Sequence, residues 1–204
     1  FSGIAACLLA TAATAAEQSP SVIWTVGQAD RSASEFALAP DRFRDFLAND
    51  FGYEDKYFLV GHSVPAADFP YVLPGPADTW GGTWPTSGWR THQVNILFGL
   101  KEIPSDGTCT LVVDLLDYAK NFLPLVKVSV NTQDAKFQLD APGLSVADQR
   151  KPNQMEKIVD TLSITGNLAK ATPRRLEIPI RPGVLKAGGN EVTITVLEGS
   201  WILF

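Results

Sequence analysis

The apolar and polar residues of this chain alternate with the period of two that marks a half-buried β-strand. In LVKVSVN (125–131) valine occupies every second position, and EVTITVL (191–197) alternates valine and isoleucine with threonine. Strands with one apolar and one polar face favour an antiparallel sandwich over a parallel sheet. Short runs rich in β-branched and aromatic residues predict strands over 22–27, 56–61, 93–100, 110–116, 125–131, 135–139, 175–180 and 191–197.

The pattern of period 3.6 is confined to PDRFRDFLANDF (40–51), where Phe43, Phe46 and Leu47 share one side and Pro40 suits a first turn. One short helix is therefore expected. The predicted fold class is all-β, an antiparallel jelly-roll sandwich over 22–204. SWILF (200–204) indicates the start of a further strand, and its apolar ending leads us to expect that the sandwich is truncated at its C-terminus within a longer, multidomain protein.

Residues 1–16 contain no charged side chain and are small and apolar. They are typical of the apolar and cleavage regions of a signal peptide whose basic N-terminal region is missing. The chain is therefore expected to be secreted or periplasmic. Lipidation at Cys7 is the alternative, although the apolar residues that follow Cys7 do not resemble a polar tether. No later run is long enough to span a bilayer, so no membrane contact is expected beyond export.

Composition excludes several functional classes. The formal net charge is −5 and Lys and Arg form no basic stripe, which argues against a nucleic-acid partner. Removal of residues 1–16 leaves Cys109 as the one cysteine, so neither an intrachain disulfide nor a zinc site built on thiolates is expected.

The sequence shows no constellation of catalytic residues. His62 and His92 are the only histidines, and no nucleophile or metalloprotease motif accompanies them. Asp114 and Asp117 are three residues apart, a spacing that would point them to opposite faces of a continuous strand. We therefore predict no catalytic residue in this segment and no cofactor. Structural calcium is the alternative, with oxygen ligands from the acidic loop residues Asp30, Glu35 and Asp78.

The most unusual stretch is YVLPGPADTWGGTWPTSGWRTH (71–92), called here the aromatic segment, which holds three of the five tryptophans. Rigid aromatic rings can stack on the apolar faces of sugars, while nearby polar side chains bond the hydroxyl groups. Contact with a glycan, contact with a neighbouring domain and burial in the core all remain open for this segment. The candidate carbohydrate-binding residues are Tyr71, Asp78, Trp80, Trp84, Trp89, Arg90 and His92.

Several motifs together resemble the carbohydrate-binding-like, galactose-binding-like jelly-roll domain of rhamnogalacturonan lyases. One is the hairpin within IPIRPGVLKAGGNEVTITVLEGSW (178–201), which resembles the pattern L-x-x-G-x-N-x-[IV] common to galactose-binding-like modules. The other matching residues are Trp24 to Gly27, Asp30, Glu35, Phe36, Asp68 to Pro70, Ile96 to Leu100, Leu111 to Asp114 and Val128 to Asn131.

This resemblance implies a non-catalytic carbohydrate-binding or accessory module of a secreted polysaccharide lyase or glycoside hydrolase. Its partner would be a polysaccharide or a downstream catalytic domain. The alternative is a structural interface domain that packs the aromatic segment against that catalytic domain and binds no glycan of its own. The family's catalytic residues lie in another domain, so none is transferred to this chain.

Overall fold

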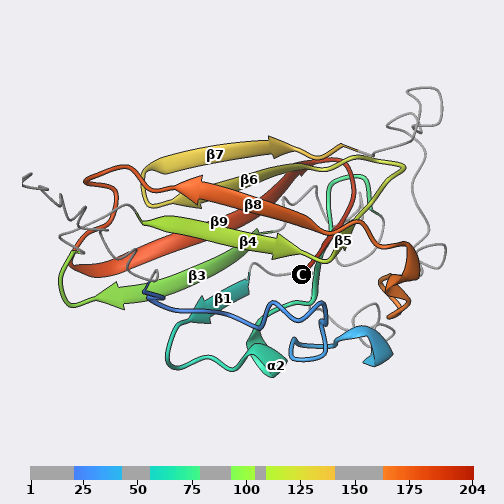
Figure 1. Cartoon of the computed structure of the whole chain (residues 1–204), viewed down its shortest axis with the longest axis horizontal. Coiled ribbons are helices and arrows are strands. Elements are labelled where there is room, and N and C mark those ends of the chain that lie inside the picture. The colour runs from blue at the N-terminus through green and yellow to red at the C-terminus, as the bar shows by residue number, and fades with distance from the viewer. Residues whose placement is uncertain (1–20, 43–55, 79–92, 104–108, 141–162) are drawn as a thin grey trace, which may run out of the picture.

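The computed structural model describes residues 21–42, 56–78, 93–103, 109–140 and 163–204 of the chain. These residues form two layers of β-strands, with the layer of β4 and β8 in front of β3, β6 and β9 (Figure 1). The predicted all-β sandwich is confirmed.

The rear layer is a five-stranded sheet whose pairing is antiparallel except for β1 and β3, which run parallel. β1 lies at the edge of the sheet, and because it runs parallel to β3 the two strands cannot be joined by a tight hairpin. In spatial order the strands are β1 (Lys56–Leu59), β3 (Gln93–Leu100), β9 (Gly188–Glu198), β6 (Leu125–Val130) and β7 (Gln133–Gln138).

The front layer combines a three-stranded and a two-stranded sheet. Only Leu116 separates β4 from β5, and its N–H donates to the carbonyl of Leu203 in β10 at 2.8 Å. One run of chain therefore pairs with β8 along its first part and with β10 along its second. The strands are β4 (Thr110–Leu115) with β8 (Arg174–Pro179), and β2 (Val72–Leu73), β10 (Ile202–Leu203) and β5 (Asp117–Tyr118).

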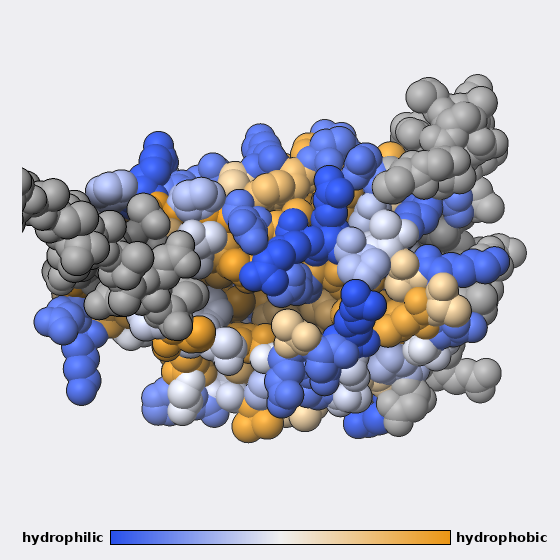
Figure 2. All heavy atoms as spheres, viewed as in Figure 1, coloured by the Kyte–Doolittle hydropathy of each residue, from blue (hydrophilic) through white to orange (hydrophobic). Residues whose placement is uncertain are grey.

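The hydrophobic core lies between the two layers and follows the predicted alternation. Each fully buried aliphatic side chain stabilises the fold by about 1.5–3 kcal/mol relative to an exposed one. The opposite face of β4 and β8 is largely polar, with Val112 as an exposed apolar residue, and Figure 2 shows hydrophilic side chains over it. The buried residues include Val94, Ile96 and Phe98 of β3, Val126, Val128 and Val130 of β6, Val192, Ile194 and Val196 of β9, and Val113, Leu115, Leu176 and Ile178 of β4 and β8.

Helical structure within the described residues is short: η1 (Pro40–Arg42), α2 (Pro65–Asp68) and η6 (Leu168–Lys170). Of the range 40–51, where a helix is expected, the structure describes only the 3-10 turn η1, and residues 43–51 lie outside the described residues. Helix α2 was not expected. It forms because Pro65 suits the first turn and the Asp68 carboxylate accepts a hydrogen bond from Val64 N at 2.7 Å.

The strand predicted over 22–27 is wrong, because these residues are described and belong to no strand. Trp24 packs on Phe98 with ring centroids 5.2 Å apart, whereas Val22 and Ile23 are exposed. β-Propensity records how well a side chain fits a paired, half-buried surface, and no strand edge pairs with this segment. By contrast, β10 forms within 200–204 as expected.

Candidate functional site

The structure describes only the first part of the aromatic segment, residues 71–78. Five of the candidate residues therefore lie outside the described residues: Trp80, Trp84, Trp89, Arg90 and His92. The described part shows where the chain enters the aromatic segment and which residues it contacts there.

Tyr71 is a core residue. Its side chain is fully enclosed, and its backbone carbonyl accepts a hydrogen bond from Phe204 N at 2.9 Å. Burial raises the pKa of the Tyr71 phenol. In the described structure the Tyr71 ring is therefore part of the core, and its contact with a glycan stays a prediction.

Asp78 is also buried, with 1 % of its surface exposed. Its carboxylate accepts hydrogen bonds from Gly75 N at 2.7 Å and from the hydroxyl of Ser200. Its own N–H donates to Gly75 O at 3.1 Å, which closes a turn. These hydrogen bonds connect residues 75–78 to Ser200, and the bonding of a sugar by Asp78 stays a prediction.

Two glycines allow residues 75–78 to lie against the turn between β9 and β10. A Cβ on Gly75 would lie under 3.0 Å from the carbonyl oxygens of Gly199 and Ser200. Gly199 has a φ of 79°, and a Cβ there would lie under 3.0 Å from the backbone of Phe122 and Leu123. Side chains at these positions would push the backbones apart, so close approach requires glycine.

The described residues on either side of 79–92 bond to the last part of β9 and to the turn that follows it. Gln93, the first residue of β3, is paired with Thr195 of β9. On the other side, Ala77 N donates to Gly199 O at 2.9 Å. Ala77 and Gln93, which lie on either side of residues 79–92, are thus both bonded to residues 195–200.

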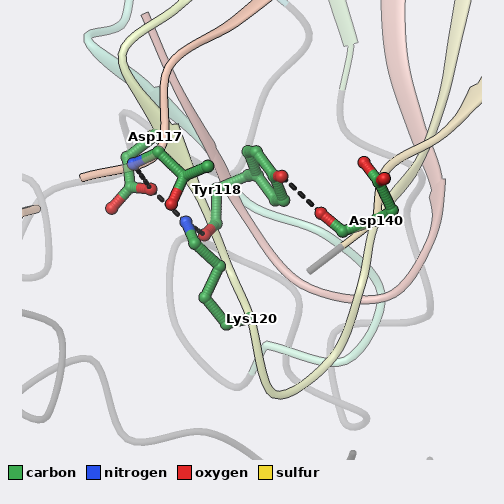
Figure 3. A network of polar contacts seen from close by, with 5 residues as sticks. Asp117, Tyr118, Lys120 and Asp140 are labelled. Carbon is green, nitrogen blue, oxygen red and sulfur yellow. Dashed lines mark hydrogen bonds and ion pairs between the residues drawn. The ribbon is translucent and has the colours of Figure 1, made fainter. Parts of the chain in front are cut away.

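The same end of the sandwich, called here the loop end, carries a polar network around residues 117–120 (Figure 3). Asp117 is buried, and its carboxylate accepts hydrogen bonds from Thr172 N at 2.9 Å and from the ammonium of Lys120. Lys120 also donates to Tyr118 O at 2.6 Å and lies 4.0 Å from the centre of the Tyr118 ring. Buried charge is tolerated here because each partner is hydrogen-bonded.

Tyr118 links this network to an exposed ion pair. Its hydroxyl donates to the backbone carbonyl of Asp140, and the Asp140 carboxylate pairs with Arg174 at 3.2 Å. Burial raises the pKa of the Tyr118 phenol, and the negative charge of Asp140 adds to the effect. The side chains of Asp140 and Arg174 are 65 % and 44 % exposed, so they offer a carboxylate and a guanidinium to a ligand in solvent.

Most of the other residues considered for catalysis or metal binding make hydrogen bonds or ion pairs within the protein. Asp114 pairs with Arg175 on the exposed face at 3.3 Å, and His62 lies in an exposed turn. Asp30 and Glu35 accept hydrogen bonds from Ser32 N and Gln28 N within an N-terminal turn. Across the described ranges, no three His, Cys, Asp or Glu side chains gather in a way that could hold a metal ion.

Sequence reasoning missed the roles of Lys120, Asp140 and Arg174. Asp117 drew attention only as a candidate for catalysis, because it lies three residues from Asp114. The i, i+3 spacing of Asp117 and Lys120 was a usable signal, since opposite charges in a turn can pair. Nothing local marks Asp140 and Arg174 as partners, because only the fold brings β7 and β8 together at this end.

In the part of the chain that the structure describes, no helix is long and apolar enough to cross a membrane.

The comparison with protein families agrees with this architecture. None of the curated proteins matches the chain. The family model described as CBM-like, domain III of polysaccharide lyase family 4, matches residues 22–203. This chain, which also carries the motifs of the rhamnogalacturonan lyase domain, belongs to that CBM-like family of polysaccharide lyase domains.

Proposed function

We propose that this chain is a non-catalytic carbohydrate-binding module of a secreted enzyme that degrades polysaccharide, either a lyase or a glycoside hydrolase. The observation that carries the proposal is the family match over residues 22–203. The aromatic segment is the proposed contact surface, with Trp80, Trp84 and Trp89 stacking on sugar rings.

The geometry of the loop end supports this location. A binding loop gains affinity when its ends are held, because less conformational freedom is lost when the ligand binds. Residues 195–200 bond Ala77 and Gln93, which lie just before and just after residues 79–92. The Asp140–Arg174 pair is exposed at the same end of the sandwich and supplies groups that can bond sugar hydroxyls or a uronate carboxylate.

Affinity electrophoresis of the purified chain in gels that contain pectin rich in rhamnogalacturonan, homogalacturonan or mannan tests the proposal. Retardation is expected in the first gel. The Trp84→Ala and Trp89→Ala variants should each bind at least about tenfold more weakly, as expected for aromatic anchors. Their unfolding midpoints should stay close to that of the unchanged protein.

Trp24→Ala is the matched control, because Trp24 packs on Phe98 and lies outside the aromatic segment. It should lower stability and leave retardation unchanged. Absence of retardation in all three gels contradicts the proposed function. Loss of folding in the Trp84 and Trp89 variants places the segment in the core instead, and depolymerisation by the purified chain contradicts the non-catalytic assignment.

A second candidate function, a structural interface domain, is favoured by the exposed apolar residues around β1. Tyr57 and Leu59 are 60 % and 44 % exposed on this edge strand, and Val64, just before α2, is 57 % exposed. Exposed apolar residues grouped in this way are typical of contact surfaces. A complex between this chain and a catalytic domain of its parent enzyme, abolished by Leu59→Lys and indifferent to Trp84→Ala, would support this function over glycan binding.

A further inference from the structure

We propose that Arg174 binds the carboxylate of a uronate sugar and thereby makes the loop end specific for acidic polysaccharides. This inference rests on the proposed glycan binding and names the class of sugar that is recognised. Arg174 is the first residue of β8, and its backbone is held by pairing with Leu115 of β4.

The Arg174 side chain bridges the two layers of the sandwich. Arg174 shares a face of β8 with the buried residues Leu176 and Ile178, so it lies on the core side of the front layer, at the first position of the strand. Its Nη2 atom is 3.2 Å from a carboxylate oxygen of Asp140, which follows β7 of the rear layer. The Tyr118 hydroxyl holds the backbone carbonyl of Asp140, so the guanidinium has a fixed place between the layers.

The ion pair with Asp140 engages only part of the Arg174 guanidinium. It joins one nitrogen to one oxygen, whereas a guanidinium presents a planar fork of N–H groups that matches both oxygens of a carboxylate. Within the described residues, no second carboxylate pairs with Arg174. Because 44 % of its side chain is exposed, the remaining N–H groups can meet a carboxylate from solvent.

The neighbouring Arg175 provides a comparison. Its Nε lies 2.9 Å from Glu177 and its Nη1 lies 3.3 Å from Asp114, so two carboxylates compensate one guanidinium. Successive side chains alternate along a strand, which places Arg175 on the outer face of β8. The two arginines have the same charge and are both about half exposed, but only Arg174 has donors left for an anionic ligand.

The charge of the whole chain makes such a local contact necessary. The formal net charge is −5, so an acidic polysaccharide is not drawn to this protein by its overall field. Recognition of a uronate therefore depends on a cation in a defined position. Arg174 meets this requirement, and the adjacent Asp140 carboxylate can accept hydrogen bonds from sugar hydroxyls.

Affinity electrophoresis of the full chain tests this inference in two gels. One contains pectin rich in rhamnogalacturonan, and the other contains the same pectin with its carboxyl groups reduced to alcohols. Arg174→Gln should bind the acidic polymer at least about tenfold more weakly, because charge-assisted hydrogen bonds are lost, and should bind the reduced polymer within about twofold of the unchanged protein.

Arg175→Gln is the matched control, since it removes the same charge from the next residue. It should stay within about twofold of the unchanged protein in both gels, because Arg175 already has two carboxylate partners. Arg174→Lys should fall between Arg174→Gln and the unchanged protein in the acidic gel, because lysine keeps the charge and lacks the planar fork. All three variants alter exposed ion pairs, so their unfolding midpoints should stay close to that of the unchanged protein.

A titration followed by proton–nitrogen NMR gives a direct readout of the contact. The Nε–H signal of Arg174 should shift when sodium galacturonate is added and should not shift with galactose, which lacks the carboxylate. The Nε–H signal of Arg175 should stay in place in both titrations, because that group is already bonded to Glu177.

The outcomes separate this inference from the proposed function. If the unchanged protein is retarded equally in the two gels, or if Arg174→Gln and Arg175→Gln lose equal affinity, the role of Arg174 is overturned while glycan binding stands. An unchanged protein that is retarded in neither gel contradicts glycan binding. In that case a shift of the Arg174 signal with galacturonate alone still supports the uronate contact, and the absence of this shift overturns it as well.

Discussion

The two ends of the sandwich are held by different chemistry. At the end opposite the loop end, called here the hairpin end, neutral amides satisfy the backbone: Asn131 donates to Val184 O at 2.7 Å, and Asn190 donates to Lys186 O at 2.8 Å. At the loop end, the buried carboxylates of Asp78 and Asp117 have this role. The amides link the turn at Asn131, between β6 and β7, to residues 184–190. The carboxylates instead bond residues near the ends of the long connections 74–92 and 139–173.

The hairpin end also explains the motif that resembles the rhamnogalacturonan lyase domain. Asn190 is the asparagine of L-x-x-G-x-N-x-[IV], and its side chain accepts from Lys186 N at 3.0 Å and donates to Gly188 O at 3.1 Å. The motif therefore encodes a turn. Because the side chain of Asn190 is engaged in this turn, a motif of this kind identifies a fold better than a function.

The largest loss of stability is expected from alanine in place of Gly199 at the loop end, and Gly188 at the hairpin end is the comparison. Gly199 and Gly188 have φ values of 79° and 89°, but a Cβ would meet the backbone of Leu123 at Gly199 and nothing within 4 Å at Gly188. Gly188→Ala should cost about 1 kcal/mol, the price of a left-handed alanine. Gly199→Ala should cost about 4 kcal/mol, because backbone must also move. Urea unfolding measures both values, and equal losses would contradict the close approach at Gly199.

The next effect is expected at Asn190. Asn190→Ala removes a buried amide that bonds Lys186 and Asn131, and it leaves their backbone and side-chain groups without this partner. The free energy of unfolding should fall by about 3 kcal/mol. Gln138→Ala is the control: this exposed amide makes only long bonds of 3.4 Å, so a loss within about 0.5 kcal/mol is expected in the same unfolding measurement. Similar losses in the two variants would refute a structural role for the motif.

At the loop end, Asp117→Ala should lower the free energy of unfolding by about 2 kcal/mol, less than a fully buried ion pair because Lys120 is partly exposed. Part of this loss comes from Thr172 N, which loses its acceptor. A double-mutant cycle with Lys120→Met should give a coupling of about 1 kcal/mol. Zero coupling would show that Asp117 stabilises the fold through Thr172 alone. In that case the Asp117–Lys120 ion pair would not distinguish the loop end from the amide-bonded hairpin end.

The long strands could be predicted from the sequence because their alternation is local. The predicted range 93–100 coincides with β3, and the expected strands over 110–116, 125–131 and 191–197 appear as β4, β6 and β9. The two-residue strands β2 and β5 could not be found in this way. They exist because β10 lies between them and supplies hydrogen bonds from both sides, which is a tertiary effect.

The candidate site was predictable only in composition. The sequence reveals the aromatic segment, but it gives no sign that Tyr71 and Asp78 are buried and so does not distinguish them from Trp80 and Trp84 as candidate ligand contacts. Burial of Tyr71 and Asp78 depends on β10 and Ser200, at the far end of the chain. No local pattern reports such a contact. What the segment 79–92 touches stays a prediction, since those residues lie outside the described part of the structure.

The smallest effect is expected from Asp134, an exposed carboxylate at the start of β7 near the hairpin end. A hydrogen bond from Ser129 lowers the pKa of the Asp134 carboxyl, and the charge of Lys127 contributes less. Because the folded-state pKa lies below the unfolded-state value, the stabilisation is present above the unfolded-state pKa and is lost as pH falls through the folded-state pKa. In a carboxyl-carbon NMR titration, Ser129→Ala should raise the pKa toward its ordinary value, and Lys127→Met should raise it less. The reverse order would mean that charge controls this carboxylate, and the hairpin end would then resemble the loop end more than its amide network indicates.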